Sequence, residues 1–457
     1  MRFSTILITL TLFLLFGCEQ AKEQQKESHP PEIKSATEKA ETVQQQSVGG
    51  NGSGLFHQPI TPKLVELPSE ALAYWRVNTA EKPALVLFSY DPLLKSIDPS
   101  LQEEARELTL TGSSKELRLH GSFNTAEPLI LPTQAVAAAL DAGLFSKLIW
   151  VFPSKADPAL LQLEFFRNQM VEEQLLTEED AAKLKLNDGI YSGEVRGIPF
   201  EAVHHQQLFK MEEPFVLHIE LGFFRGLYDN EIKSPLYTLL RNTVEGIRQQ
   251  NWQPLATTLS YSTLEGAVAL DVRFVINDLA KLMRNPQLLN QEMPKEWQLR
   301  SEALYAGDMY SESKKIELSE QMVTVAPQSA AANFDRFQAL FLDQKVEPAL
   351  ESLAKAVELD PGYAASYLEL TQLAIQDGNF DKALELVTLA EQQLPENPFI
   401  GLQKAFLLSR SGQPRAALDQ LDKAPQQWST IYHPQVPAKI VELKKEITAE
   451  SNEQKEE

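Results

Sequence analysis

The chain has 457 residues, a formal net charge of −21 at pH 7 and a single cysteine. A chain of this length can bury more than one hydrophobic core, which predicts several domains. Its excess of acidic side chains repels phosphate backbones and anionic lipids, so we expect no nucleic-acid partner and no electrostatic attachment to a membrane. One cysteine excludes an intramolecular disulfide and a metal site built from cysteines.

The first 18 residues have the pattern of a secretory signal peptide. Residues 6–16 form an apolar run after Arg2, and this run is shorter than the roughly 20 residues needed to span a bilayer. The run ends Leu-Phe-Gly before Cys18, and this ending resembles the lipobox of bacterial lipoproteins. The resemblance implies cleavage before Cys18 and lipid attachment to it, with more than one acyl chain, as stable anchoring requires. An ordinary signal peptide is the alternative.

The residues after Cys18 predict a tether to the membrane. Glu19 favours the outer membrane, because the lipoprotein sorting pattern uses Asp at this place for retention in the inner membrane. Residues 19–54 contain almost no large apolar side chain and end in a glycine-rich run, so we expect them to be disordered. A flexible coil of this length spans roughly 30–36 Å. We therefore predict a lipid-anchored protein of the bacterial cell envelope that faces the periplasm.

Residues 55–290 alternate β-rich apolar runs with helical stretches, which indicates an α/β domain of a three-layer type. The expected strands are 84–90, 117–120, 147–152, 200–204, 215–221 and 257–261. The expected helices are 132–142, 156–169, 235–249 and 266–283. His204 and His205 point to opposite faces if both lie in a strand, so we expect no shared metal ion. Trp150, Phe223 and Phe224 are expected in the core.

Three segments of this domain, 86–93, 143–153 and 215–224, together resemble an uncharacterised bacterial and eukaryotic family with an arginase/deacetylase-like fold. That family carries Asp-x-His-x-Asp and Asp-x-Asp-x-Asp patterns at two strand ends, and such clusters bind divalent metal and activate water. This chain departs from both patterns, so the resemblance implies a degenerate site. The positions read Ser89, Asp91 and Leu93 in the first pattern, and His218, Glu220 and Gly222 in the second.

Asp91, His218 and Glu220 are the remaining candidates for a three-ligand metal site. His218 and Glu220 share one strand face, with about 7 Å between their Cα atoms. A hydrogen-bonded cluster without metal is the other interpretation of the same three residues. The chain contains no glycine-rich phosphate loop, no Gly-x-Ser-x-Gly elbow and no His-Glu-x-x-His motif. We expect no catalytic residue and no cofactor, with a divalent metal as the alternative.

Residues 295–431 repeat with a period of 34, which predicts four units of two antiparallel helices. The repeating positions are Pro294, Pro327, Pro361 and Pro395, then Ala349, Ala383 and Ala417, and Gly378 with Gly412. The units resemble tetratricopeptide repeats, whose grooves bind peptides or proteins. Residues 432–449 are expected to form a capping helix, and 450–457 a frayed tail.

These patterns together favour an α/β domain followed by an all-α repeat array. The predicted function is non-catalytic scaffolding, with a protein or peptide bound in the repeat groove. One alternative is a metal-dependent hydrolase of amide or amidine bonds that uses Asp91, His218 and Glu220. A second is a pseudo-enzyme that binds a small ligand at the same strand ends. The repeats could also serve as a packing platform for the α/β domain.

Overall fold

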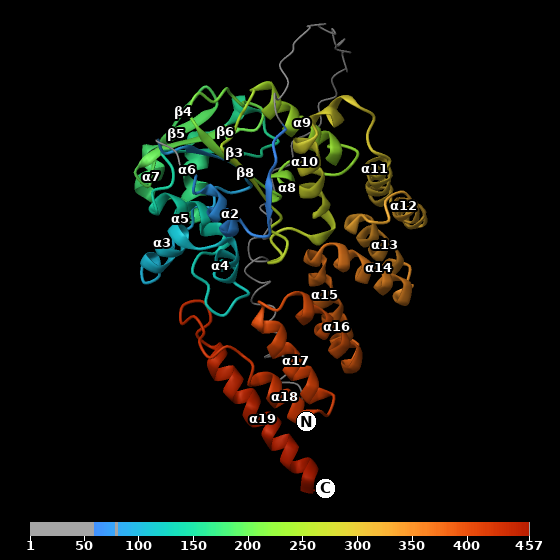
Figure 1. The fold of residues 1–457 in the computed structure, drawn as a ribbon. Coiled ribbons are helices and arrows are strands. Elements are labelled where there is room, and N and C mark those ends of the chain that lie inside the picture. The colour runs from blue at the N-terminus through green and yellow to red at the C-terminus, as the bar shows by residue number, and fades with distance from the viewer. Residues whose placement is uncertain (1–58, 78–80, 457) are drawn as a thin grey trace, which may run out of the picture. The chain divides into compact units, whose positions relative to one another are not determined.

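The computed structural model describes residues 59–77 and 81–456 (Figure 1). The predictions for the signal peptide, for Cys18 and for the tether lie outside the described residues. Within the described ranges, no helix is both long enough and apolar enough to cross a membrane.

Eight strands form one mixed sheet in the order β1-β8-β7-β2-β3-β6-β5-β4. The strands are β1 (Lys63–Val65), β2 (Ala84–Phe88), β3 (Lys147–Phe152), β4 (Lys185–Asn187), β5 (Ile190–Val195), β6 (Ile198–His204), β7 (Phe215–Glu220) and β8 (Ala256–Ser260). From β1 to β6 in this order the pairs are parallel, while β5 pairs antiparallel with β6 and with β4. The central strands β2 and β7 are buried along their whole length, as their nearly continuous apolar sequences require in a parallel sheet covered on both faces.

Helices cover both faces of the sheet, which confirms the three-layer α/β prediction. One face packs against α8 (Gly222–Arg225), α9 (Leu236–Gln249) and α10 (Phe274–Arg284). The other face packs against the helices that precede or interrupt the first strands. These are α2 (Pro68–Trp75), α3 (Gln102–Thr111), α4 (Ser114–Leu119), α5 (Ala135–Asp141), α6 (Leu163–Glu172) and α7 (Glu178–Lys183).

Some local predictions in this domain are wrong. Residues 117–120 were expected to be a strand, but Leu117 lies in α4, because Ser113 and Glu116 form a capping box that starts a helix. Their side chains accept hydrogen bonds from each other's backbone N–H at 3.2 and 2.7 Å. The helices expected at 156–169 and 266–283 begin later, at α6 and α10, after short 3₁₀ turns.

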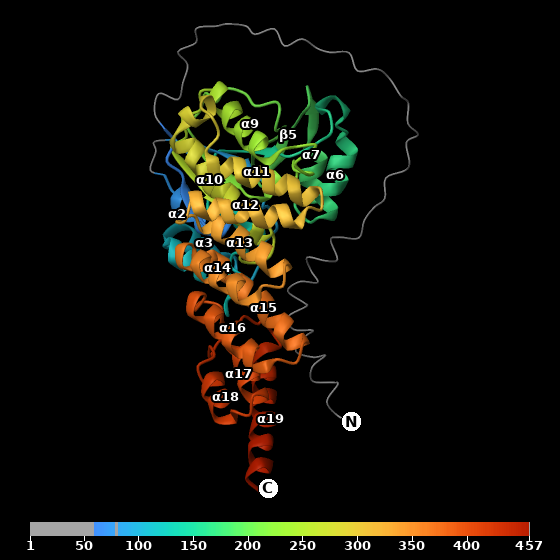
Figure 2. The same ribbon diagram turned by 90° about the vertical axis from the view of Figure 1, so that its right-hand side faces the viewer.

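The C-terminal part is a helical array, as the 34-residue period predicts (Figures 1 and 2). Its pairs are α11 (Lys295–Asp308) with α12 (Glu312–Val325), α13 (Ala330–Leu342) with α14 (Val346–Leu359), α15 (Ala365–Gln376) with α16 (Phe380–Gln393), and α17 (Pro398–Arg410) with α18 (Pro414–Leu421). Ala349, Ala383 and Ala417 are fully buried where the helices approach most closely. A last helix, α19 (Val436–Glu456), packs Ile447 against the α18 cluster and covers the end of the stack.

The turns inside the four helix pairs share one backbone geometry. Tyr310, Gln344, Gly378 and Gly412 lie 34 residues apart, and their φ angles are 55°, 60°, 73° and 72°. In each turn the next residue donates its N–H to the carbonyl oxygen five residues earlier, at 2.8–3.0 Å, the bond that ends a helix in a Schellman motif. Glycine adopts this left-handed conformation without steric cost, whereas Tyr310 and Gln344 do not.

Candidate functional site

The carboxyl edge between β2 and β7 is the switch point of the sheet. From β2 the chain continues to its neighbour β3, and from β7 it continues to β8 on the opposite side. Ligands of open α/β sheets commonly bind in the crevice outside such a point. Asp91 follows β2 and Glu220 ends β7, so two of the three predicted ligands lie at this edge.

Asp91 is partly exposed and Glu220 is buried, and the two carboxyl groups lie close enough for the charge of Asp91 to act on Glu220. Glu220 is only 8% exposed, and the hydroxyl of Ser262 donates to its Oε1 at 2.9 Å. Burial, together with the nearby charge of Asp91, raises the pKa of Glu220 to about 8. Burial also raises the pKa of Asp91, against the hydrogen bond that its Oδ1 accepts from the Leu93 N–H at 2.8 Å. Glu220 therefore carries its proton at neutral pH and can act as a hydrogen-bond donor.

Two strained residues hold this pair. Leu93 and Ser262 both have φ angles of 54°, in the left-handed region that non-glycine residues rarely adopt. Each of them donates a hydrogen bond to one of the two carboxyl groups. Strain of about 1–3 kcal/mol per residue is typical of ligand sites, where the surrounding structure fixes the backbone. The strain therefore marks this edge independently of the sequence motifs.

His218 lies on the same strand but is engaged in a separate network. Its Nδ1 lies 2.7 Å from the Thr258 hydroxyl and its Nε2 lies 3.3 Å from the Ser260 hydroxyl. The indole of Trp75 packs edge-on against the imidazole and donates to Thr258 at 3.0 Å. Burial lowers the pKa of His218 to about 3, so the ring is neutral. Both ring nitrogens already have hydroxyl partners.

The structure therefore brings Asp91 and Glu220 together and gives His218 other partners. Within residues 59–77 and 81–456, no group of three or more His, Cys, Asp or Glu side chains is arranged to hold a metal ion. The present arrangement does not fit a three-ligand centre, because metal binding would require His218 to exchange a hydroxyl partner for the ion. Metal binding by the three residues stays a prediction.

The histidine pair behaves differently from the expectation. Strand β6 ends at His204, so His205 is free of the strand alternation and the two ring centroids lie 4.5 Å apart. His204 Nε2 lies 3.1 Å from the carbonyl oxygen of Ser154. Burial, with a smaller effect from His204, lowers the pKa of His205 to about 4. The condition of the expectation, that both histidines lie in a strand, is not met, while Trp150 and the Phe223–Phe224 pair lie in the core as expected.

A buried arginine joins the repeat array to the carboxyl edge of the sheet. Arg273 is 1% exposed and donates to both carboxylate oxygens of Asp360, which follows α14, at 2.8 and 2.9 Å. It also donates to Glu66, after β1, and to Thr263, after β8, at 2.8 Å each. Burial alone would lower the pKa of Arg273, but the hydrogen bonds and charges of Glu66 and Asp360 outweigh it, so the guanidinium stays charged. A Cβ at Gly362 would lie 2.1 Å from its Cζ, so only glycine fits there.

A second buried arginine fixes the first repeat. Arg300, on α11, donates to Asp335 on α13 and to Glu296 at 2.9 Å each. Its Nη1 lies 3.2 Å from the hydroxyl of Tyr237 on α9, which in turn donates to Asp278 on α10 at 2.9 Å. Together with the Arg273 cluster, these bonds turn the first helices of the array toward α9, α10 and the short 3₁₀ turn η3 (Leu270–Val272) that contacts α13.

The end of the array also contacts the α/β domain. Between α18 and α19, His433 Nε2 lies 2.9 Å from the carbonyl oxygen of Thr125, and the Ser429 N–H donates to Ala126 at 2.9 Å. Phe123 packs edge-on against the His433 ring. The segment between α18 and α19 is therefore fastened to residues 123–126 of the α/β domain.

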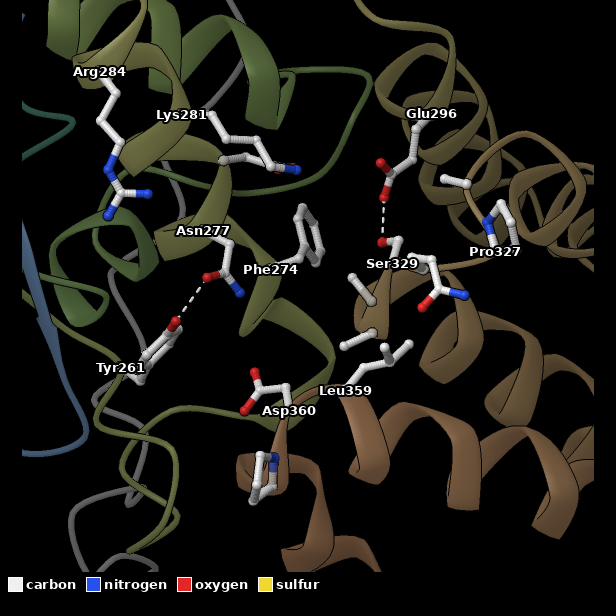
Figure 3. A pocket seen from close by; sticks show the side chains of 16 residues that line it. Tyr261, Phe274, Asn277, Lys281, Arg284, Glu296, Pro327, Ser329, Leu359 and Asp360 are labelled. Atoms are coloured by element: carbon white, nitrogen blue, oxygen red, sulfur yellow. Dashed lines mark hydrogen bonds and ion pairs between the residues drawn. The ribbon is translucent and has the colours of Figure 1, made fainter.

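A cleft of about 620 Å³ opens between α10 and the loops that precede α13 and follow α14 (Figure 3). On its α10 side the Tyr261 hydroxyl donates to Asn277 at 2.7 Å, and on the side of the repeats the Ser329 hydroxyl donates to Glu296 at 2.5 Å. Of its two cationic side chains, Lys281 is paired with Asp278 at 3.0 Å and Arg284 donates to the carbonyl oxygen of Pro62 at 3.4 Å. Sequence reasoning gave no signal for this cleft, since its residues come from separate elements.

Comparison with known proteins supports the repeat prediction. Residues 340–398 match the tetratricopeptide repeat family, which confirms this part of the array. No curated protein matches the chain. Two crystal structures of MamA are similar to this chain. The first is 18% identical, covers 34% of this chain and 91% of its own, and has a TM-score of 0.23. The second is 17% identical, covers 44% of this chain and 93% of its own, and has a TM-score of 0.25. Kinesin-light-chain-related TPR-like repeats from Podospora anserina match with 16% identity, 36% of this chain, 100% of theirs and a TM-score of 0.22.

Proposed function

We propose that this protein is a lipid-anchored scaffold of the bacterial cell envelope that binds partner proteins through its repeat array and catalyses no reaction. The observation that carries the proposal is the stack of four helix pairs with its tetratricopeptide match, because such repeats generally bind proteins or peptides. The lipobox-like ending before Cys18 supports anchoring, and Glu19 supports the outer membrane with a periplasmic orientation.

The α/β domain acts in this proposal as the base on which the array is mounted. The clusters of Arg273 and Arg300 fasten the first helices of the array to α9, α10 and the carboxyl edge of the sheet. A partner would then meet the second helices and the turns, rather than a fully open groove. Mounting on the domain uses Arg300 on α11, Asp335 on α13 and Asp360 after α14, and it leaves Tyr310, Leu342 and Leu373 exposed for a partner.

Anchoring and partner binding are tested separately. Cys18→Ser should release the chain from isolated membranes, and mass spectrometry of the wild-type N-terminal peptide should show acyl chains on Cys18. Chemical cross-linking in envelopes, quantified by mass spectrometry, should give partners that are lost when the array surface is substituted. The control is Leu160→Ser with Phe165→Ser on the α/β domain, where two exposed apolar side chains lie far from the array in sequence. Partners that survive every array variant would exclude this function.

The switch-point edge supports a second candidate function, the binding of a small ligand. The specific observation is the Asp91–Glu220 pair held by the strained Leu93 and Ser262. A protonated Glu220 could donate to a ligand oxygen while Asp91 accepts from a ligand N–H. The metal-dependent amide or amidine hydrolase remains a variant of this candidate that needs a divalent metal. Thermal stabilisation by a small molecule without metal would favour the pseudo-enzyme over the hydrolase.

A further inference from the structure

The turns of the first three repeats expose an apolar edge. Six large side chains at or near these turns expose between 40% and 90% of their surface. They are Tyr305, Met309 and Tyr310 in the first repeat, Leu342 and Val346 in the second, and Leu373 in the third. The edge ends at the fourth repeat, where Leu407, 34 residues after Leu373, is fully buried and Gly412 occupies the position of Tyr310. Exposed apolar side chains that recur at equivalent turns of neighbouring repeats mark a candidate binding surface.

Tyr310, in the first repeat, is the most exposed side chain of this edge. Its backbone is in the left-handed conformation that the third and fourth repeats assign to glycine, so a bulky side chain is strained there. Its side chain is nonetheless 90% exposed, and so gains little packing in return. A strained and exposed aromatic residue is explained if its contacts are made with another molecule.

Acidic side chains border the apolar edge in each turn. Glu312 borders the first, Glu347 the second and Asp381 the third, and within the part of the chain that the structure describes none of these three forms a salt bridge. Three lysines of the same turns are paired, Lys314 with Glu317 at 2.9 Å, Lys345 with Asp343 at 2.8 Å and Lys382 with Glu385 at 2.9 Å. Lys315, in the first turn, lies near Asp271 of the α/β domain. A negatively charged border attracts a cationic surface and repels a second copy of this chain, whose net charge is −21.

We propose that the turn edge of the first three repeats, which includes Tyr310, docks a partner protein segment with apolar and basic side chains. This inference rests on the proposed scaffold function and assigns it a surface and a partner chemistry. None of the six side chains of this edge takes part in the Arg273 or Arg300 clusters, although Asp308, beside Met309, accepts a hydrogen bond from the Glu231 N–H of the α/β domain at 2.7 Å.

The test uses the full chain in detergent and two fluorescent amphipathic peptides. Both peptides place Leu and Trp on one face of the helix. On the opposite face the first peptide carries Lys, and the second carries Glu at the same positions. We expect anisotropy titrations to show the Lys peptide bound at least about tenfold more tightly than the Glu peptide. Tyr310→Gly should weaken binding of the Lys peptide by roughly tenfold, the loss typical of an aromatic anchor. The Leu160→Ser/Phe165→Ser control should bind within about twofold of wild type.

Tyr310→Gly also separates binding from folding. Glycine relieves the left-handed strain, so the variant should keep or raise the midpoint temperature of unfolding while it loses binding. Equal binding of both peptides, or unchanged binding by the glycine variant, would overturn the docking proposal. A concentration-dependent dimer that Tyr310→Gly abolishes would overturn it in favour of a second copy. If envelope partners bind in a way that depends on the array but still bind the Tyr310→Gly variant, the docking proposal for this edge would be refuted and the scaffold function would stand.

Discussion

Replacing Arg273 with alanine should strongly destabilise the contact between the repeat array and the sheet. The substitution removes four hydrogen bonds to carboxylates and leaves Glu66 and Asp360, whose side chains are 15% and 18% exposed, without their shared cation. Removing one partner of a buried ion pair costs about 3–5 kcal/mol. The guanidinium also lies 3.8 Å from the ring centroid of Tyr261, a contact that contributes about 0.5–2 kcal/mol more.

The assay is guanidinium unfolding of the full chain, read by circular dichroism, with hydrogen exchange of the residues around Asp360. Arg225→Ala is the matched control, because that arginine is exposed and makes one hydrogen bond, to the carbonyl oxygen of Ala267 at 3.3 Å, so its loss should stay within about 0.5 kcal/mol. Adding Asp360→Asn to Arg273→Ala should recover about 1–3 kcal/mol, since one unpaired charge is then removed. A loss below about 1 kcal/mol in Arg273→Ala, with unchanged exchange, would refute the claim that this arginine fastens the array.

Two further predictions concern the switch-point edge. In the folded chain Glu220 has a pKa of about 8, against an ordinary value of 4.5. Between these two pH values the folded state therefore binds more protons than the unfolded state, and the free energy of unfolding falls as the pH rises from 4.5 to 8. Glu220→Gln should flatten this fall and stabilise the protein at pH 9 by an amount of the order of 4 kcal/mol; an unchanged pH profile in urea unfolding would contradict the buried proton. Elemental analysis of the purified chain beside Asp91→Ala/Glu220→Ala tests the metal hypothesis. Near-stoichiometric zinc, manganese or iron that the variant lacks would support the hydrolase, and metal-free folded protein would exclude it.

Much of the fold follows from two sequence patterns, the 34-residue period of the repeats and the apolar runs of the buried strands. The 34-residue spacing of Ala349, Ala383 and Ala417 predicts the repeat array because small residues must recur wherever equivalent helices meet. The buried strands β2 and β7 are predictable from their apolar runs. The edge strands β1 and β4 have three residues each, and their neighbour β5 is partly polar, so no apolar run marks them. Residues 117–120 were misassigned because the capping box of Ser113 outweighs a short apolar alternation.

The candidate site, like the fold, is only partly predictable from the sequence. That Asp91 and Glu220 would meet was predictable, since both follow parallel strands at the same edge. The hydroxyl partners of His218 come from β8, whose register with β7 no local pattern specifies. Arg273 and Arg300 gave no signal in the sequence at all. Arg273 reaches Glu66 across 207 positions and Asp360 across 87, and such pairings exist only once the tertiary fold has formed.

The contacts between the first repeat and the α/β domain limit where a peptide can bind to the array. Trp297 on α11 stacks on Tyr237 at 5.2 Å between ring centroids, and both belong to the hydrophobic cluster of α9 and α10. The α/β domain thus covers the first repeat as α19 covers the last, so neither end of the stack needs a partner for its stability. A peptide that entered between the first helices and α10 would first have to separate these contacts. If separation costs about 4 kcal/mol, the apparent affinity falls roughly 1,000-fold, whereas docking on the exposed Tyr310 side chain breaks none of the contacts between Trp297 and Tyr237.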